Sequence, residues 1–438
     1  MTKLHTQNAP DVKVIKPHFL LGAVFFGLSV VLMVLAKAHL FGPYFEHHLL
    51  AVVHTNLLGW AMLLVFGSLY QLIPVVFETK LFSEKLAYLT LFLTVSGVLF
   101  LAYGFWTGNF QGLFLWGALI LYSALFLFGF NILMSYKDSS LKNVKSFFII
   151  ASIFWLFFTQ TEGLLMALNF KWNILDTNNL YHLKIHAVAG LVGFFLQMIF
   201  GVGTTLIPMF LVSHKHSEKP LWPSFLLLNA GLLFLLSGWL FSPDIKWLIF
   251  KGYFLIVIGI LLYLKFVRDA FVNRFKRILD EGMKPTMLMF IFLFLPIVLS
   301  AMLMWNGKPY SNEAFTISFL FGFSMIFGVI NMIILGQTYK TIPFIIWLDT
   351  YKPYVGKYQI PLPKEVYNVK WATWQFRFYL VYLILFFISF LFEIKILLEI
   401  SLLFLILTSL IYNYNMIKMF THKPILKPLQ KPGSDEKR

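Results

Sequence analysis

Long apolar runs dominate this sequence and decide what kind of protein it can form. Of its 438 residues, 59% are hydrophobic and only 12% are charged, and Phe alone occurs 51 times. A water-soluble fold has too little interior for so many apolar side chains, whereas a bilayer solvates them and requires about 20 apolar residues per spanning helix. The composition therefore excludes a soluble globular protein, a disordered chain and a nucleic-acid-binding domain. It predicts an all-α, polytopic membrane protein that contacts the lipid bilayer.

Twelve of these runs are long enough to cross a membrane. They are Phe19 to Ala38, Leu49 to Phe77, Leu86 to Phe105, Leu113 to Met134, Phe147 to Leu168, Tyr181 to Val212, Leu221 to Phe241, Trp247 to Phe266, Met287 to Trp305, Phe315 to Trp347, Trp374 to Phe392, and Ile396 to Met416. We expect residues 1–438 to form a single membrane domain. The first run is too long for a cleavable signal and lacks a small-residue cleavage site after it.

The basic residues lie mainly in alternate loops. If residue 1 is cytoplasmic, all but seven of the 35 Lys and Arg residues fall on the cytoplasmic side; the seven are Lys37, Lys171, Lys184, Lys246, Lys251, Lys308 and Lys395. This bias is typical of cytoplasmic loops. It predicts cytoplasmic N- and C-termini in a bacterial inner membrane, and it explains the net charge of +16 without a nucleic-acid partner. Residues 419–438 are expected to form a basic, solvated cytoplasmic tail.

The chain also contains a threefold repeat. Its prolines Pro74, Pro208 and Pro343 are separated by 134 and 135 residues, and three further columns keep these spacings: Gly59, Gly193 and Gly328; Gly67, Gly201 and Gly336; Ile73, Ile207 and Ile342. We predict three four-helix repeats, at about 19–134, 147–266 and 287–416, around a pseudo-threefold axis. The second, sixth and tenth helices should line the interior. Their glycines should permit close helix contacts, and their prolines should end the helices at the cytoplasmic side.

Few histidines lie inside the spans, and those few are candidate ligands. His54 opens the second run in the string His54-Thr55-Asn56, while His182 and His186 open the sixth. Each is either a hydrogen-bonded histidine at a helix end or a ligand of haem iron or another metal through neutral imidazole. Because His182 and His186 are four residues apart on one helix face, they could also form a metal clamp.

Other polar residues are predicted at the same depth. Glu162 in the fifth run is either hydrogen-bonded near the interface or a proton-handling group with a partner, and Thr159 and Gln160 precede it. The loop before the second run holds further histidines, His39, His47 and His48. These loop histidines are either solvated or metal ligands. Among them, His48 is the candidate metal ligand.

The string His54-Thr55-Asn56, followed by a glycine and an aromatic residue, resembles the second helix of subunit I of haem-copper oxidases, with the C-family cytochrome oxidases and nitric oxide reductases most similar. The sixth run, with His186 seven residues before Gly193, resembles a haem-binding helix of those families. The resemblance implies twelve helices in three arcs and a b-type haem near the outer face. It further implies that His54 and His186 bind haem, that copper is present, and that a cytochrome c-type or other respiratory subunit is a partner.

The sequence departs from that family at the copper site. Phe321 and Phe323 occupy the frame of the haem-ligating histidines of the tenth helix, and the seventh run contains no histidine. A conventional haem-copper binuclear centre therefore cannot form. The absence of cysteine also excludes a covalently attached c-type haem in this chain.

We therefore expect a haem-binding membrane protein for respiratory electron transfer or for redox chemistry of nitric oxide or oxygen. Two alternatives stay open. One is a reductase with an unconventional site made of His54, His182, His186 and Glu162. The other is a non-redox protein that handles or transports haem or copper, or that protects against nitric oxide stress.

Overall fold

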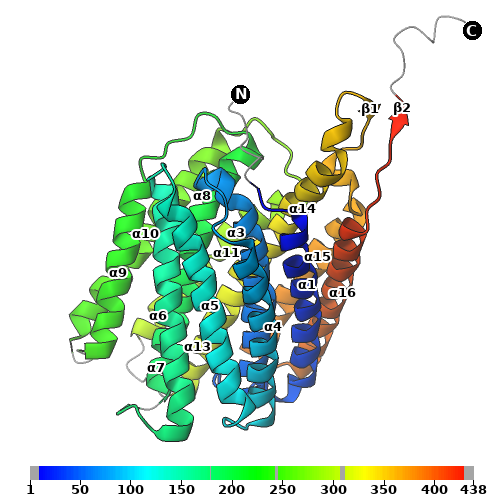
Figure 1. Cartoon of the computed structure of the whole chain (residues 1–438). Coiled ribbons are helices and arrows are strands. Elements are labelled where there is room, and N and C mark those ends of the chain that lie inside the picture. Colours follow the sequence, from blue (N-terminus) through cyan, green and yellow to red (C-terminus); the bar gives the residue numbers. More distant parts are fainter. Residues whose placement is uncertain (1–8, 178, 242–244, 306–310, 429–438) are drawn as a thin grey trace, which may run out of the picture.

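The computed structural model describes residues 9–177, 179–241, 245–305 and 311–428. Its long elements are all helices, packed side by side into one bundle (Figure 1). Twelve helical spans of this described part are long and apolar enough to cross a membrane, and they fall on the twelve predicted runs. Large apolar side chains are exposed on the outside of the bundle, among them Phe92, Leu233 and Trp305. These features confirm a multi-pass, all-α membrane protein with a lipid-facing surface.

The first four spans comprise α1 (Val12–Leu35), the second span, α4 (Glu84–Thr107) and α5 (Leu113–Lys137). The second span is continuous through α2 (His47–His54), η3 (Thr55–Ala61) and α3 (Met62–Val76), and the short η2 (Lys37–His39) precedes it. Helix α1 begins seven residues before the predicted Phe19, because Asp11 caps it by accepting a hydrogen bond from the Lys13 backbone.

The next four spans comprise α6 (Val144–Trp172), the sixth span, α9 (Leu221–Phe241) and α10 (Lys246–Val272). The sixth span runs through α7 (Asn179–Val188), η4 (Ala189–Leu196) and α8 (Gln197–Leu211).

The last four spans begin with α11 (Met283–Phe292) and α12 (Phe294–Trp305), which form one span together. The tenth span comprises α13 (Asn312–Phe323), η5 (Ser324–Asn331), α14 (Met332–Tyr351) and η6 (Lys352–Tyr354). After η7 (Pro363–Glu365) come α15 (Val369–Leu391) and α16 (Lys395–Phe420).

The second, sixth and tenth spans form the interior of the bundle. In their most apolar windows 67%, 67% and 78% of the residues are buried, whereas no other span exceeds 50%. The prediction that these three helices line the interior is confirmed. Their central segments η3 and η5 contact each other, as do η4 and η5.

Each interior span contains one π-helical segment, and the segments begin at Thr55, Ala189 and Ser324. These starts are 134 and 135 residues apart, the same spacings as the prolines. A π-helical turn carries an extra residue per turn and frequently marks a functional site. The sequence offered no local signal for these segments, but their spacing follows the repeat.

The glycines of the interior spans permit close helix contacts, as predicted. A Cβ added at Gly59 would lie 2.5 Å from the Phe25 ring of α1, and one at Gly193 would lie 2.8 Å from Trp155 of α6. Gly328 is less crowded, with a side chain of α11 at 3.4 Å. In each case the neighbour is the helix that precedes the interior span in the sequence.

The prediction that the repeated prolines end their helices is wrong for the third copy. Pro74 and Pro208 lie inside α3 and α8, two and three residues before those helices end, but α14 continues from Pro343 to Tyr351. A proline removes only one backbone donor from a helix, and Pro343 is buried among packed neighbours that offset this cost.

The described ends of the chain lie at the same end of the bundle (Figure 1). Strand β2 (Lys427–Pro428) pairs antiparallel with β1 (Tyr358–Gln359), and the Tyr351 hydroxyl lies 2.7 Å from His422 Nε2. The first part of the predicted tail, 419–438, therefore touches a neighbouring loop through β2 and His422, while most of residues 421–428 are exposed. Residues 429–438 lie outside the described part.

Candidate functional site

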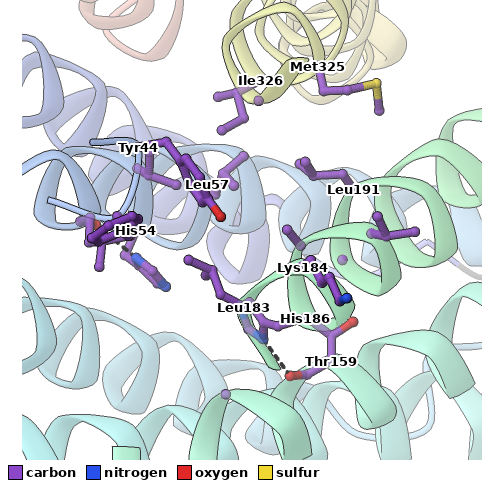
Figure 2. Close-up of a pocket in the computed structure, with 18 of the residues that line it drawn as sticks. Tyr44, His54, Leu57, Thr159, Leu183, Lys184, His186, Leu191, Met325 and Ile326 are labelled. Carbon is purple, nitrogen blue, oxygen red and sulfur yellow. Dashed lines mark hydrogen bonds between the residues drawn. The ribbon is translucent and has the colours of Figure 1, made fainter. Parts of the chain in front are cut away.

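A cavity of about 1120 Å³ lies between the interior spans and their neighbours. Side chains of α2, η3, α4, α5, α6, α7, η4, α13 and η5 line it, and most of them are apolar. Two histidines from different helices stand on its wall, His54 and His186 (Figure 2). They are the two residues that the sequence predicted as haem ligands.

His54 is the last residue of α2, directly before the π-helical segment η3. Its Nδ1 lies 2.8 Å from the Leu50 carbonyl oxygen, one turn earlier, and its ring stacks on Phe105 with centroids 4.9 Å apart. Thr55 and Asn56, the other two residues of the string, are fully buried and point away from water into the helix packing. They support the helix, whereas His54 faces the cavity.

His186 lies in the last turn of α7 and is held by α6. Its Nδ1 lies 2.9 Å from the Thr159 carbonyl oxygen. Gly163 provides the room for the ring, because a Cβ added there would lie 3.0 Å from His186 Cε1 and 3.3 Å from Nδ1. The sequence did not predict a role for Gly163 or Phe105. Each contacts a histidine more than twenty residues away, and no local sequence pattern reveals such a contact.

The two hydrogen bonds determine the tautomer of both imidazoles. A carbonyl oxygen can only accept, so Nδ1 carries the proton in each ring and the neutral Nε2 has a free lone pair. Neither Nε2 has a hydrogen-bond partner in the part of the chain that the structure describes. Metal-ligating histidines commonly donate their other N–H to a backbone carbonyl in this way, which orients the ring.

The two rings are close enough to share one metal. Their centroids are 6.4 Å apart and their planes differ by 23°. Two imidazoles on opposite sides of one metal, with metal–nitrogen bonds of about 2 Å, have centroids about 6 to 6.5 Å apart. The cavity around them is lined mainly by apolar side chains.

His182 has other partners and does not line the cavity. Its Nδ1 lies 2.9 Å from Glu162 Oε2, and its Nε2 lies 2.8 Å from the Thr177 hydroxyl. Both ring nitrogens of His182 are therefore engaged. Although His182 and His186 are four residues apart, they do not direct free nitrogens at a common metal position. Glu162 has a partner, as an ionisable group inside a span requires.

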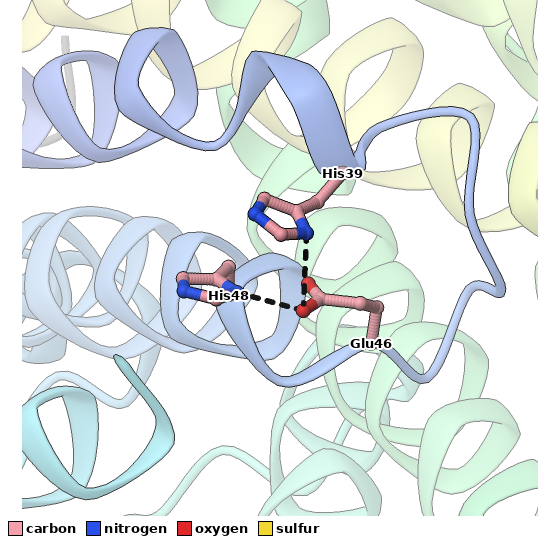
Figure 3. A group of neighbouring side chains, drawn as sticks. All are labelled: His39, Glu46 and His48. Carbon is pink, nitrogen blue, oxygen red and sulfur yellow. Dashed lines mark hydrogen bonds and ion pairs between the residues drawn. The ribbon is translucent and has the colours of Figure 1, made fainter. Parts of the chain in front are cut away.

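His48 lies apart from this pair, at the end of the bundle opposite the described termini. It stands with His39 and Glu46 in the loop before α2 and in its first turn (Figure 3). His47 is adjacent, and its Nδ1 lies 2.9 Å from the Phe105 carbonyl oxygen. Glu46 and His47 are also among the residues that line the cavity, so this loop reaches the same cavity as His54.

In the tenth span, the positions where the resemblance leads one to expect histidines hold the aromatic residues Phe321 and Phe323. Phe323 stacks on Phe386 with centroids 4.1 Å apart, and Phe321 lines the cavity. Helix α9 contains no histidine. The side chains on the cavity wall therefore offer one facing histidine pair in the described residues.

Comparisons with known proteins give a distant relative. No family model matches the chain. The chain is similar to an uncharacterized protein of Aquifex aeolicus (strain VF5), with 27% identity over 290 residues, which cover 66% of this chain and 70% of the relative.

Proposed function

We propose that this protein binds one b-type haem through His54 and His186 and transfers electrons within a membrane. The observation that carries the proposal is the pair of Nδ1-anchored imidazoles whose free Nε2 atoms face one cavity, with centroids 6.4 Å apart. His54 and His186 would both hold the haem, and it would supply reversible one-electron transfer when bound. With both imidazoles engaged in this way, electron transfer matches the site better than binding of oxygen or nitric oxide.

The remaining wall supports the same conclusion. Phe105 holds the His54 ring by stacking, and the mainly apolar lining would lower the dielectric around a bound haem. Lys184 lines the cavity with its ammonium group 4.1 Å from the Tyr181 ring centroid. It has no ion-pair partner among the described residues, so it is available for the anionic carboxylates of a haem.

The proposal includes the architecture that the resemblance to haem-copper oxidase subunit I implies. The three π-helical segments, the three prolines and the two sets of three glycines share spacings of 134 and 135 residues, which supports three four-helix units around a pseudo-threefold axis. The basic loops support cytoplasmic termini in a bacterial inner membrane, with the histidine pair toward the outer face. A respiratory partner such as a cytochrome c-type subunit would supply or remove the electrons.

An absorption spectrum tests the haem proposal directly. Protein purified from cells supplied with haem precursor should show a Soret band, and its ferric form should have a low-spin spectrum. His54→Ala and His186→Ala should each lose the six-coordinate signature, whereas His214→Ala, at an exposed loop histidine, should match the parent. A parent without haem, or a double variant with an unchanged spectrum, would refute the proposal.

A second candidate function rests on Gln160. Its side-chain nitrogen and oxygen are both buried and have no hydrogen-bond partner among the described residues, and the residue lines the cavity next to Thr159. If only one histidine binds iron, Gln160 could hydrogen-bond a small ligand such as nitric oxide. Carbon monoxide decides between the two functions, because a reduced haem with two histidine ligands resists it and a five-coordinate haem binds it at once.

A further inference from the structure

Three imidazoles surround one carboxylate at the end of the bundle opposite the described termini. Glu46 caps α2, with Oε2 accepting a hydrogen bond from the Leu49 backbone at 3.1 Å. Its other oxygen, Oε1, faces His48 Nδ1 at 2.7 Å and His39 Nδ1 at 3.6 Å (Figure 3). The same oxygen lies 3.5 Å from His47 Nε2. The helix cap thus holds the carboxylate in place and directs one oxygen at all three rings.

The contact between His47 Nε2 and the Glu46 carboxylate is favourable only with a positive charge between them. His47 Nδ1 must carry the ring proton, because it lies 2.9 Å from the Phe105 carbonyl oxygen, which can only accept. A neutral His47 therefore directs the lone pair of Nε2 at the Glu46 carboxylate. Two such acceptors repel each other, and a cation between them converts the repulsion into two favourable contacts.

The rings are already packed together. His48 stacks between its neighbours, with centroids 4.3 Å from His39 and 4.1 Å from His47, and the edge of Trp106 contacts it at 4.8 Å. Ligand atoms of His39, Glu46 and His48 all lie within 4.8 Å of one another. Tetrahedral ligands about 2 Å from a metal are about 3.4 Å apart, so a bound ion would displace the proton that His48 Nδ1 now donates to Glu46 Oε1 at 2.7 Å and would separate these two atoms slightly.

We infer that this cluster is a binding site for a divalent transition-metal ion such as Zn²⁺ or Cu²⁺. His39, Glu46 and His48 supply three ligands, and His47 Nε2 supplies the fourth. Three imidazoles with one carboxylate suit these metals, whereas Ca²⁺ and Mg²⁺ prefer oxygen ligands alone. The hydrogen bond from His47 to the Phe105 carbonyl is the outer contact that orients such a ligand.

The site is accessible and separate from the haem pair. The His39 side chain is 45% exposed and Glu46 is 16% exposed, so an ion can enter from the aqueous side. The proposal uses neither His54 nor His186, and it goes beyond the haem function. The two sites are nevertheless joined, because Phe105 accepts from His47 through its carbonyl oxygen and stacks on His54 through its ring. A bound ion would therefore hold this part of the cavity wall in place.

Metal titration of the full-length protein tests the site. The protein is purified in detergent with a tag that contains no histidine, stripped with a chelator, and titrated with Zn²⁺ by calorimetry and with Co²⁺ by visible absorption. Because His54 and His186 could also share a metal, the titration is made in the His54→Ala/His186→Ala background, which should bind one ion per chain, and Co²⁺ should give the intense bands of tetrahedral coordination. Addition of excess Ca²⁺ should leave this binding unchanged.

Matched variants separate ligation from folding. Added to that background, the double substitution His39→Ala/His48→Ala and the substitution Glu46→Gln, which keeps an oxygen for the helix cap, should each weaken binding about 100-fold or more. His214→Ala should leave the affinity of the background unchanged. Because the background lacks both His54 and His186, failure of the haem proposal does not affect this result. No stoichiometric binding in the background, or equal affinity after His39→Ala/His48→Ala, would overturn the inference.

Discussion

Gly163 provides the most direct test of how the chain positions His186. A methyl group added by Gly163→Ala would lie 3.0 Å from His186 Cε1 and 3.3 Å from Nδ1, closer than the ordinary contact of about 3.5 to 4.0 Å. The ring must move by several tenths of an ångström, and its bond to the Thr159 carbonyl oxygen, now 2.9 Å, must stretch. Loss of that bond costs about 0.5 to 1.5 kcal/mol, which corresponds to about 2- to 12-fold weaker haem binding.

The assay is a haem titration of the apoprotein, followed by the Soret band, with the dissociation constant as readout. Gly322→Ala is the matched control, because Gly322 lines the same cavity but has no atom within 4 Å of the added methyl group. We expect Gly163→Ala to weaken binding and Gly322→Ala to match the parent. Equal dissociation constants for all three proteins would refute the proposed support of His186 by α6.

Three further predictions concern stability, measured by thermal unfolding in detergent. Glu162→Gln should lower the free energy of unfolding by about 1 to 3 kcal/mol, because it removes a charged partner of buried His182, and the haem spectrum should not change. Burial alone raises the pKa of Asp280, but hydrogen bonds from two lysines outweigh it and hold this pKa below its ordinary value. The resulting stabilisation is present at neutral pH and is lost as the pH falls through the folded-state pKa, so Asp280→Asn should reduce the difference in melting temperature between pH 7 and pH 3. Gly59→Ala should destabilise by about 1 to 3 kcal/mol because its methyl group would lie 2.5 Å from the Phe25 ring; unchanged melting would contradict the close packing of α1 on η3.

Several features of the fold could be predicted because their causes are local in the sequence. An apolar run of sufficient length must form a membrane helix, since no other backbone arrangement satisfies its polar groups in lipid. The recurrence of glycine and proline columns likewise identified the second, sixth and tenth spans as the interior helices. The third proline was misinterpreted, because the sequence shows that a donor is missing but not that buried neighbours let α14 continue past Pro343.

The candidate site depended on contacts between distant parts of the chain. The sequence identified His54, His182 and His186 as equal candidates, and only the packing of α6 against α7 engaged His182 with Glu162 and left His186 facing the cavity. The spacing of four residues between the two histidines could not reveal this, because their different partners are set by a neighbouring helix.

By itself, then, the amino-acid sequence determined the number of membrane spans, their order and the interior position of three of them. The tertiary structure alone decided that His54 lies near His186 and that Gly163 leaves space for the His186 ring. It also decided that the imidazoles of the loop before α2 lie around the Glu46 carboxylate. The physical reason is that hydropathy acts on each segment separately, whereas ligand geometry depends on close packing between segments and on which hydrogen-bond acceptors that packing brings within reach.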